Sequence, residues 1–332
     1  MTRDELRSLA AVRPERGRVV SIFLDLDPSQ FATGDAKASA VNSALDDAER
    51  RISGDESLDR DTRAQLRADV TRIREALDPQ HLAAGGAHGL AVFASGPAGL
   101  LEVVPTSQRL TPRVEVADRP VVEPLAPLAG DERLLVALAG QGQSRLFAGT
   151  GARLEEAGHL TDHINADIKG AVDEDRANHL RAVAAVLQQR VGDHDLLFTA
   201  GAEQAGSELA EHLHAYVRDK LAGHVRVDPG AATPATVQAA VAPLLEQRRA
   251  HREREAVERL AAGLGTDGGH AVAGREAVHD MLTQRRVETL LLAEGHSDEE
   301  AVEAALEQDA DVLVLPADVP DLAEGVAALL RF

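Results

Sequence analysis

Residues 134–150 read LLVALAGQGQSRLFAGT, in which two apolar runs are separated by GQGQ at positions 140–143. Short apolar runs that end at turn-forming residues are typical of buried β-strands. Glycine is favoured in the tight connection of an antiparallel hairpin, because it adopts backbone conformations that other residues avoid. We therefore expect a β-hairpin here, with positions 140–143 at its tip.

The segment that follows this hairpin alternates between helical and extended patterns. Apolar residues at helical spacing predict helices over 176–191 and 207–224, and short apolar runs predict strands over 195–201 and 225–228. Strands that alternate with helices are typical of a layered α/β domain. We assign residues 129–230 to this middle domain.

The segment before the hairpin has the same mixed character. Residues 18–26, RVVSIFLDL, are apolar and rich in β-branched side chains, which predicts a buried strand. Helical spacing predicts helices over 36–52 and 59–77, and GPAG at 96–99 predicts the turn of a second hairpin. A proline-rich stretch then ends the segment, so we place a first α/β domain at residues 1–128.

The third segment opens with the start signals of a long helix. Thr233 is a preferred N-cap residue, and Pro234 fits the first helical position. Helical spacing continues to about Leu264, and further helices then alternate with apolar strands. We assign residues 231–332 to a C-terminal domain, so the predicted fold class is α/β with three domains.

Composition limits what these domains can do. The 332 residues include no cysteine, which excludes disulfides, zinc-thiolate sites and cysteine nucleophiles. No apolar run approaches the ~20 residues of a membrane span, and the N-terminal residues lack the pattern of a signal peptide. We therefore expect a cytoplasmic protein without membrane contact.

The charge balance is strongly acidic. A formal net charge of −20 opposes non-specific binding to nucleic-acid phosphates, so DNA is not an expected partner. The excess of acid is largest at the C-terminus, where the residues from Val287 onward include twelve acids and one base, Arg331. That segment is therefore a poor candidate for contact with RNA.

Several stretches occur in an order that resembles a known family. They are VVSIFLDLDPSQFAT, GLAVFASG, LEVVP, DRPVVEPL, VALAGQGQSRLFAG, TAGAEQAGSELAEHL, RRVETLLLAEG and VAALLRF. The set is similar to the bacterial branch of the archaeo-eukaryotic peptide chain release factor family, which includes the Pelota rescue factor. The resemblance implies a middle RNase H-like α/β sheet and a C-terminal α/β/α sandwich resembling ribosomal kink-turn binders. It also implies an N-terminal domain that differs from the codon-reading domain of the eukaryotic factors.

The catalytic motif of that family is missing. In members that cut peptidyl-tRNA, Gly-Gly-Gln lies in a long loop between the early strands of the middle domain and its first long helix. The matching stretch here is 161–175, TDHINADIKGAVDED, which has one glycine, Gly170, and no glutamine. Ester cleavage needs paired glycines for close backbone approach and a backbone amide that faces the oxyanion. A hairpin tip at 140–143 offers neither, so we assign no catalytic residue.

The resemblance therefore implies a non-catalytic, ribosome-associated translation factor that occupies the A site in rescue or hibernation. Its expected partners are the ribosome, through rRNA and tRNA, and a translational GTPase; no cofactor is expected. The candidates for a functional loop are Asp162, His163, Asn165, Asp167, Lys169 and Gly170. Two alternatives stay open: a peptidyl-tRNA hydrolase that uses the 161–175 loop, and a stress-related protein–protein adaptor without a ribosomal role.

One dense basic cluster interrupts the acidic background. It lies on the predicted long helix and consists of Arg248, Arg249, Arg252 and Arg254. Arg248 and Arg252 are four residues apart, so they share a helix face. With Lys169, these side chains are candidates for contact with rRNA or tRNA phosphates. Neighbouring glutamates leave a second interpretation open, in which the arginines form ordinary surface ion pairs.

Three polar clusters have residue types that can bind a metal ion. The clusters are His159 with Asp162, His163 and Asp167; Asp193 with His194 and Asp195; and the pair Asp25 and Asp27. Imidazole and carboxylate groups at such spacings are known metal ligands. The same residue types are common in solvated loops and at strand ends, where aspartate favours turns. We favour this second interpretation and expect no metal site.

Overall fold

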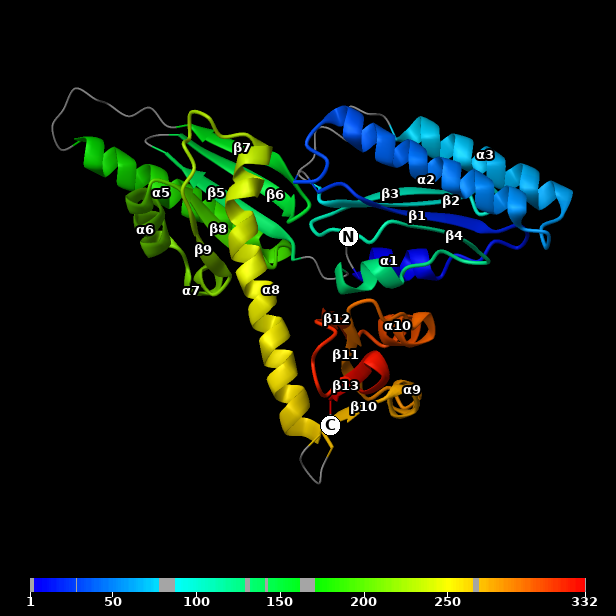
Figure 1. The fold of residues 1–332 in the computed structure, drawn as a ribbon. Coiled ribbons are helices and arrows are strands. Elements are labelled where there is room, and N and C mark those ends of the chain that lie inside the picture. The colour runs from blue at the N-terminus through cyan, green and yellow to red at the C-terminus, as the bar shows by residue number, and fades with distance from the viewer. Residues whose placement is uncertain are drawn as a thin grey trace. The chain divides into compact units, whose positions relative to one another are not determined.

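The computed structural model shows a mixed α/β protein with three β-sheets (Figure 1). The residues that it describes are 3–27, 29–77, 87–128, 132–140, 143–161, 171–264 and 269–331. The chain divides into two compact units. Unit 1 combines Met1–Gly130 with Arg248–Phe332, and unit 2 is Asp131–Gln247. Within the described ranges, no helix is both long and apolar enough to cross a membrane.

The N-terminal part of unit 1 contains an antiparallel sheet in the order β3-β2-β1-β4. Its strands are β1 (Val19–Asp25), β2 (Gly89–Ser95), β3 (Leu100–Thr106) and β4 (Arg113–Ala117). Helices α2 (Gly34–Gly54) and α3 (Arg60–Ala76) cover one face with buried residues such as Leu45 and Ile73. Packing of this kind explains the helical spacing of apolar residues in both segments.

β1 lies inside this sheet and is buried on both faces. Ile22 packs in the cluster formed with α2 and α3, and its neighbour Phe23 belongs to the cluster on the opposite face. That opposite cluster also contains residues of α1 (Arg3–Ala10) and of the 3₁₀ helix η1 (Glu123–Leu128). Burial on both faces is the reason why this strand reads as a continuous apolar run.

Unit 2 contains a five-stranded sheet in the order β7-β6-β5-β8-β9. Its strands are β5 (Leu134–Ala139), β6 (Gln143–Thr150), β7 (Arg153–Thr161), β8 (Leu196–Gly201) and β9 (Leu221–Val225). β5, β6 and β7 form an antiparallel meander, and β8 and β9 run parallel to β5. The order third, second, first, fourth, fifth is that of the expected RNase H type sheet.

Helices cover both faces of the unit 2 sheet. Residues of α5 (Ala171–Arg190), α6 (Glu203–His212) and the short α7 (Ala215–Arg218) form one buried cluster with the sheet. The first half of α8 (Pro234–Leu264) contributes to a second cluster on the other face, where Val237 is fully buried. The sheet is therefore the central layer of unit 2.

The C-terminal part of unit 1 is a three-layer sandwich. Its strands, in the order β10-β13-β11-β12, are β10 (Ala271–Ala273), β11 (Val287–Ala293), β12 (Asp311–Leu315) and β13 (Val326–Leu330). α9 (Arg275–Thr283) and α10 (Glu299–Glu307) cover one face, and Leu260 in the second half of α8 packs on the other. The expected α/β/α arrangement is confirmed.

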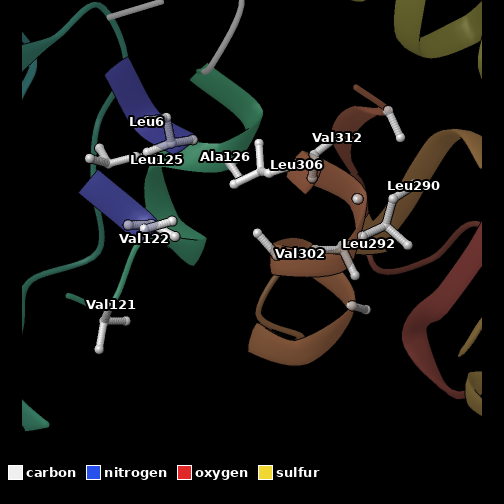
Figure 2. Close-up of a cluster of buried hydrophobic side chains, with 14 of the residues drawn as sticks. Leu6, Val121, Val122, Leu125, Ala126, Leu290, Leu292, Val302, Leu306 and Val312 are labelled. Carbon is white, nitrogen blue, oxygen red and sulfur yellow. The ribbon is translucent and has the colours of Figure 1, made fainter. Parts of the chain in front are cut away.

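The N- and C-terminal parts of unit 1 share one hydrophobic core (Figure 2). Leu6 of α1 and Leu125 of η1 belong to the same buried cluster as Val302 and Leu306 of α10 and Val312 of β12. A common core of this kind makes the two segments one folded body, although unit 2 separates them in the sequence.

The structure differs from the sequence prediction at the second domain boundary. We assigned residues 231–332 to the C-terminal domain, but Val237 and Val241 at the start of α8 are buried with the unit 2 sheet. The division between the units falls after Gln247, inside a continuous helix, where no turn residue marks it. The division into three domains itself stays a prediction.

Several elements were absent from the prediction, among them α1, β4 and β10, and one was assigned the wrong state. Neither α1 nor β4 was expected, because both are short and rich in charged residues. The helix predicted over 207–224 instead ends at His212, and β9 already begins at Leu221. Apolar residues at helical spacing continue through α7, so the pattern alone does not reveal that the chain turns back into the sheet.

Candidate functional site

One edge of the unit 2 sheet brings together the segments that the sequence singled out. β5 and β8 end side by side at Ala139 and Gly201, β6 begins at Gln143, and β7 ends at Thr161. We call this end of the sheet, at which the parallel strands β5 and β8 terminate, the carboxyl edge; the term does not refer to an outer strand. Ligands of open α/β sheets bind outside the carboxyl ends of the strands, so the carboxyl edge is the candidate site.

The GQGQ sequence forms the end of a tight hairpin at this edge. The amide of Gly140 donates a hydrogen bond to the carbonyl oxygen of Gln143 over 2.9 Å, so only positions 141–142 connect the two strands. A Cβ atom at Gly140 would lie 2.6 Å from that oxygen, which is why glycine is required there. Positions 141–142 lie outside the described residues. The predicted hairpin is confirmed, and Gln143 belongs to a strand rather than to a projecting loop.

The predicted functional loop leaves from the same edge. Gln143 is paired with Thr161 in the β6–β7 ladder, and α5 begins at Ala171. The connection between β7 and α5 therefore starts beside the hairpin. Its predicted residues all lie outside the described ranges: Asp162, His163, Asn165, Asp167, Lys169 and Gly170. Their role stays a prediction.

A buried polar pair joins the hairpin to α5. The Oγ atom of Ser144 lies 2.9 Å from Nε2 of His179, and both residues are 1% exposed. Loss of one partner would leave a buried polar group unsatisfied, which costs about 1–3 kcal/mol. The pair therefore holds α5 against the start of β6. Sequence reasoning missed it, because no pattern relates a serine in a strand to a histidine on a later helix.

Two glycines allow close packing next to the hairpin. Gly201 ends β8 with a φ of +117°, and a Cβ atom there would lie 2.5 Å from the carbonyl oxygen of Ala139. A side chain at Gly206 on α6 would collide with the imidazole of His224, whose Nδ1 lies 2.9 Å from the Thr199 hydroxyl. In the stretch TAGAEQAG, which contributes to the family resemblance, both glycines thus have a packing role.

The described residues of the carboxyl edge offer little acid–base chemistry. Gln143 is exposed at the start of β6, and the hydroxyl of Thr161 lies 3.4 Å from Nε2 of His159. Beyond the end of β8, Glu203 forms an exposed ion pair with Arg226. No group of three or more histidines or carboxylates among the described residues could hold a metal ion. Where it is described, the edge therefore presents mainly amide, hydroxyl and backbone groups.

The paired aspartates of the N-terminal sheet serve local structure. Asp25 accepts hydrogen bonds from Nε and Nη2 of Arg109 at 2.9 and 2.6 Å. Asp27 accepts from the hydroxyl and the amide of Ser29, and these bonds lower the pKa of Asp27 from 3.8 to about 2. His88 adds a weaker contact to Asp27 over 3.2 Å. The turn interpretation is confirmed for both aspartates, because Asp25 also accepts a hydrogen bond from the amide of Asp27 at 3.0 Å; Asp25 is in addition an ion-pair partner of Arg109.

The second aspartate–histidine cluster is also structural. Asp195 accepts a hydrogen bond from the amide of Arg133 at 2.8 Å, just before β5 and β8 begin. His194 donates from Nδ1 to the carbonyl oxygen of Arg190, which closes the end of α5. These bonds hold the amino-terminal ends of the two strands and the end of α5 together. In the cluster of His159, Asp162, His163 and Asp167, only His159 is among the described residues.

The predicted basic cluster lies on α8, at the start of its second half. Arg248, Arg252 and Arg254 are exposed, and Arg249 is partly buried. Nε of Arg249 donates to Glu253 over 2.8 Å, one turn further along the helix. The ion-pair interpretation is therefore confirmed for Arg249. Contact of the four arginines with phosphate stays a prediction.

Comparisons with known proteins give matches among solved structures alone. No family model matches the chain, and no curated protein matches it. The archaeal translation termination factor aRF1 is similar over 100% of this chain and 99% of its own, with 19% identity and a TM-score of 0.30. Archaeoglobus fulgidus Pelota is similar over 74% of this chain and 79% of its own, with 17% identity and a TM-score of 0.38. S. cerevisiae Dom34, a translation termination-like factor, is similar over 77% of this chain and 81% of its own, with 10% identity and a TM-score of 0.43. At these values the likeness carries no conclusion about function.

Proposed function

We propose that the chain is a non-catalytic, ribosome-associated translation factor that occupies the A site in rescue or hibernation. The ordered stretches of sequence that resemble the release factor and Pelota family support the ribosomal part. The non-catalytic part rests on the hydrogen bond between Gly140 and Gln143. A backbone amide that is held in a strand pair is not free to face the oxyanion of an ester, as a catalytic loop requires.

Contact with the ribosome is local in this proposal. The net charge of −20 repels phosphates at a distance, so binding depends on shape and on a few arginines at short range. The contact residues that we propose are Arg248, Arg249, Arg252 and Arg254 of α8, together with Lys169. The resemblance implies a translational GTPase as a further partner. Each phosphate contact adds about 0.7–0.9 to the slope of log affinity against log salt concentration.

Co-sedimentation with ribosomes over a salt series tests this function. We expect the intact chain to co-migrate at low salt and to dissociate steeply as salt rises. Replacement of Arg248, Arg249, Arg252 and Arg254 by glutamine should reduce the slope by about 2–4. A matched variant with Arg50, Arg60, Arg67 and Arg74 replaced on α2 and α3, where all four are exposed, should keep the slope of the intact chain.

The outcome discriminates between the functions. A chain that stays in the supernatant at low salt would remove the ribosomal role and leave the stress-related adaptor. Equal loss of binding in both variants would show that total charge, rather than the α8 arginines, governs the contact.

A peptidyl-tRNA hydrolase is the second candidate. The pairing of Gln143 with Thr161 favours it, because the β7–α5 connection then leaves the same edge as the hairpin. Ribosomes that carry labelled peptidyl-tRNA test this activity directly. Release that disappears when positions 162–170 are replaced by a Gly-Ser linker, and persists in Gln143→Ala, would establish the enzyme. We expect no release above background from any of these chains.

A further inference from the structure

Most outer strands of the three sheets are protected against pairing with a further strand. β10 has three residues, and β4 and β9 have five residues each, none of them exposed. β12 contacts η1. β7 is longer, but it carries exposed charged side chains and a bulge in its ladder with β6. Short length, a covering element, charges and bulges are features by which proteins prevent unwanted strand pairing.

β3 is the least protected outer strand in the described part of the chain. It has seven residues and pairs with β2 along its whole length without a bulge. Leu101 and Val103 are 36% and 37% exposed, and Glu102 between them is the one charged residue of the strand. A long, regular and apolar outer strand is a template for pairing with another strand.

The backbone groups that β3 leaves for a further strand follow from its alternation. The carbonyl oxygen of Thr106 accepts a hydrogen bond from the amide of His88 at 2.9 Å, so Thr106 bonds on the β2 side. Residues of an antiparallel strand direct their backbone groups alternately to one side and the other. Leu101, Val103 and Pro105 therefore point outward, and a proline is tolerated on that side of an outer strand. The outward side offers the amides of Leu101 and Val103 and all three carbonyl oxygens.

The two exposed apolar side chains lie on the face of the sheet that α2 and α3 cover. Leu101 and Val103 are paired with Ala94 and Val92, which belong to the buried cluster formed with these helices. Residues that are directly opposite in a ladder share a face of the sheet. A strand added beside β3 would therefore extend this apolar face and cover both side chains.

We propose that a second copy of the chain pairs with β3, so that two four-stranded N-terminal sheets join in one continuous antiparallel sheet. A two-fold axis at Val103 places this residue opposite its own copy. Leu101 then faces Pro105, and Glu102 faces Val104. An axis at Glu102 would instead place two carboxylates opposite each other, where like charges repel. The strand is thus complementary to itself in one register, as a symmetric dimer interface requires.

The expected dimer is weak and responds to salt. Contact along one strand buries little surface, so the chain should be a single copy in dilute solution and should pair at high concentration. The net charge of −20 opposes association of two copies. Salt screens this repulsion, so pairing should strengthen as salt rises. Phosphate binding by the arginines of α8 weakens under the same change, which separates this dimer from the proposed ribosomal contact.

Analytical ultracentrifugation of the full chain, up to about 1 mM, tests the pairing. We expect the mean mass to rise with concentration from the 35.2 kDa of one chain toward twice that value. Val103→Asp places two carboxylates opposite each other at the axis and should lower the association constant at least tenfold. Ser39→Asp adds the same charge at an exposed position of α2 and should leave association unchanged. A chain that stays monomeric throughout, or equal association of the two variants, overturns the proposal.

A disulfide tests the register, because the chain has no cysteine of its own. Opposed residues that exchange hydrogen bonds in an antiparallel pair have Cα atoms about 5.5 Å apart, within the span of a disulfide. With oxidised glutathione as the oxidant, Val103→Cys should therefore form a covalent dimer at least tenfold faster than Glu102→Cys, whose two copies lie out of register. Equal or faster linking of Glu102→Cys excludes the axis at Val103, and the absence of any cross-link excludes the pairing itself.

Discussion

The shared core of unit 1 and the carboxyl edge of unit 2 are built by opposite means. In the core, α1 and η1 meet α10 and β12 through side chains that water does not reach, and arginine–carboxylate pairs surround them. At the carboxyl edge the amide of Gly140 bonds to Gln143, Gly201 and Gly206 permit close packing, and one buried polar pair joins β6 to α5.

The core of unit 1 is built for stability, whereas the carboxyl edge of unit 2 has features that suit recognition. Burial of apolar surface contributes on the order of 25 cal/mol per Å² to stability, so the many buried side chains in the core of unit 1 together stabilise it strongly. The carboxyl edge depends on backbone geometry and on single hydrogen bonds, each of which contributes about 1 kcal/mol. Binding residues are often found where loops are held by a rigid sheet in this way. Substitutions in the two regions should therefore lower the free energy of unfolding by different amounts, and each should affect only the unit in which it lies.

The largest effect is expected from Val302→Asp in the shared core. Val302 is 0% exposed, and an unpaired carboxylate in an apolar site costs more than about 4 kcal/mol. We expect unit 1 to lose its cooperative unfolding transition. Tyr216 is the one tyrosine of a chain without tryptophan, so its fluorescence reports on unit 2 and should keep its urea midpoint. Far-ultraviolet circular dichroism follows the whole chain in the same titration.

Val103→Asp is the matched control for that variant. Val103 lies on the edge strand β3 and is 37% exposed, so a charge there remains in water and should change stability by less than about 1 kcal/mol. Loss of the Tyr216 transition in Val302→Asp would contradict the comparison, because it would mean that both units depend on the same core.

At the carboxyl edge the largest effect is expected from Gly201→Ala. A positive φ strains any residue with a Cβ atom, and this one would lie 2.5 Å from the carbonyl oxygen of Ala139. We expect unit 2 to lose about 2–3 kcal/mol of unfolding free energy, read from Tyr216 fluorescence in urea. Gly192→Ala is the control, because nothing lies within 4 Å of a Cβ atom there. Equal midpoints for the two variants would refute the packing role of Gly201.

Ser144→Ala should have a smaller effect. It removes the hydroxyl that bonds to buried His179, and we expect a loss of about 1–2 kcal/mol in unit 2. Hydrogen exchange should rise first in α5, since the pair holds this helix to β6. The exposed Ser207 on α6 gives the control Ser207→Ala. If α5 exchange is the same in both variants, the pair does not fix the helix.

Acid should reveal the role of Asp27. Its folded pKa of about 2 lies below the ordinary 3.8, so its hydrogen bonds stabilise the protein above pH 4, and this contribution is lost as the pH falls toward 2. Asp27→Asn should cost about 1 kcal/mol at pH 6, after allowance for solvent screening, and almost nothing near pH 2. Urea midpoints at both pH values measure the difference. A constant gap between the two proteins would exclude this titration as its source.

Sequence patterns predicted the elements whose burial follows a simple period. The GQGQ hairpin, the apolar β1 and the long α8 were all found, because each repeats apolar residues or ends at turn residues. The patterns did not reveal which elements pack together. Nothing in RDELRSLA indicates that Leu6 and Leu9 meet α10, and nothing near Gln247 marks a boundary, since helical spacing continues across it. The Ser144–His179 pair was hidden for the same reason: it is a tertiary contact between residues that are ordinary in their own segments.

The smallest effect is expected from a surface ion pair, which defines the lower limit of the comparison. Nη1 and Nη2 of Arg259 donate to the two carboxylate oxygens of Glu288 at 2.9 Å each, and the side chains are 45% and 41% exposed. Two parallel bonds fix good geometry, but water and salt screen exposed charges, so Arg259→Ala should cost about 0.5 kcal/mol at low salt and less at 1 M. Arg254→Ala, one turn earlier, removes an exposed arginine whose Nε bonds only to a backbone carbonyl, and its effect should not depend on salt. A salt-independent loss above 2 kcal/mol in Arg259→Ala would mean that packing of its aliphatic stem, rather than its charge, stabilises this position.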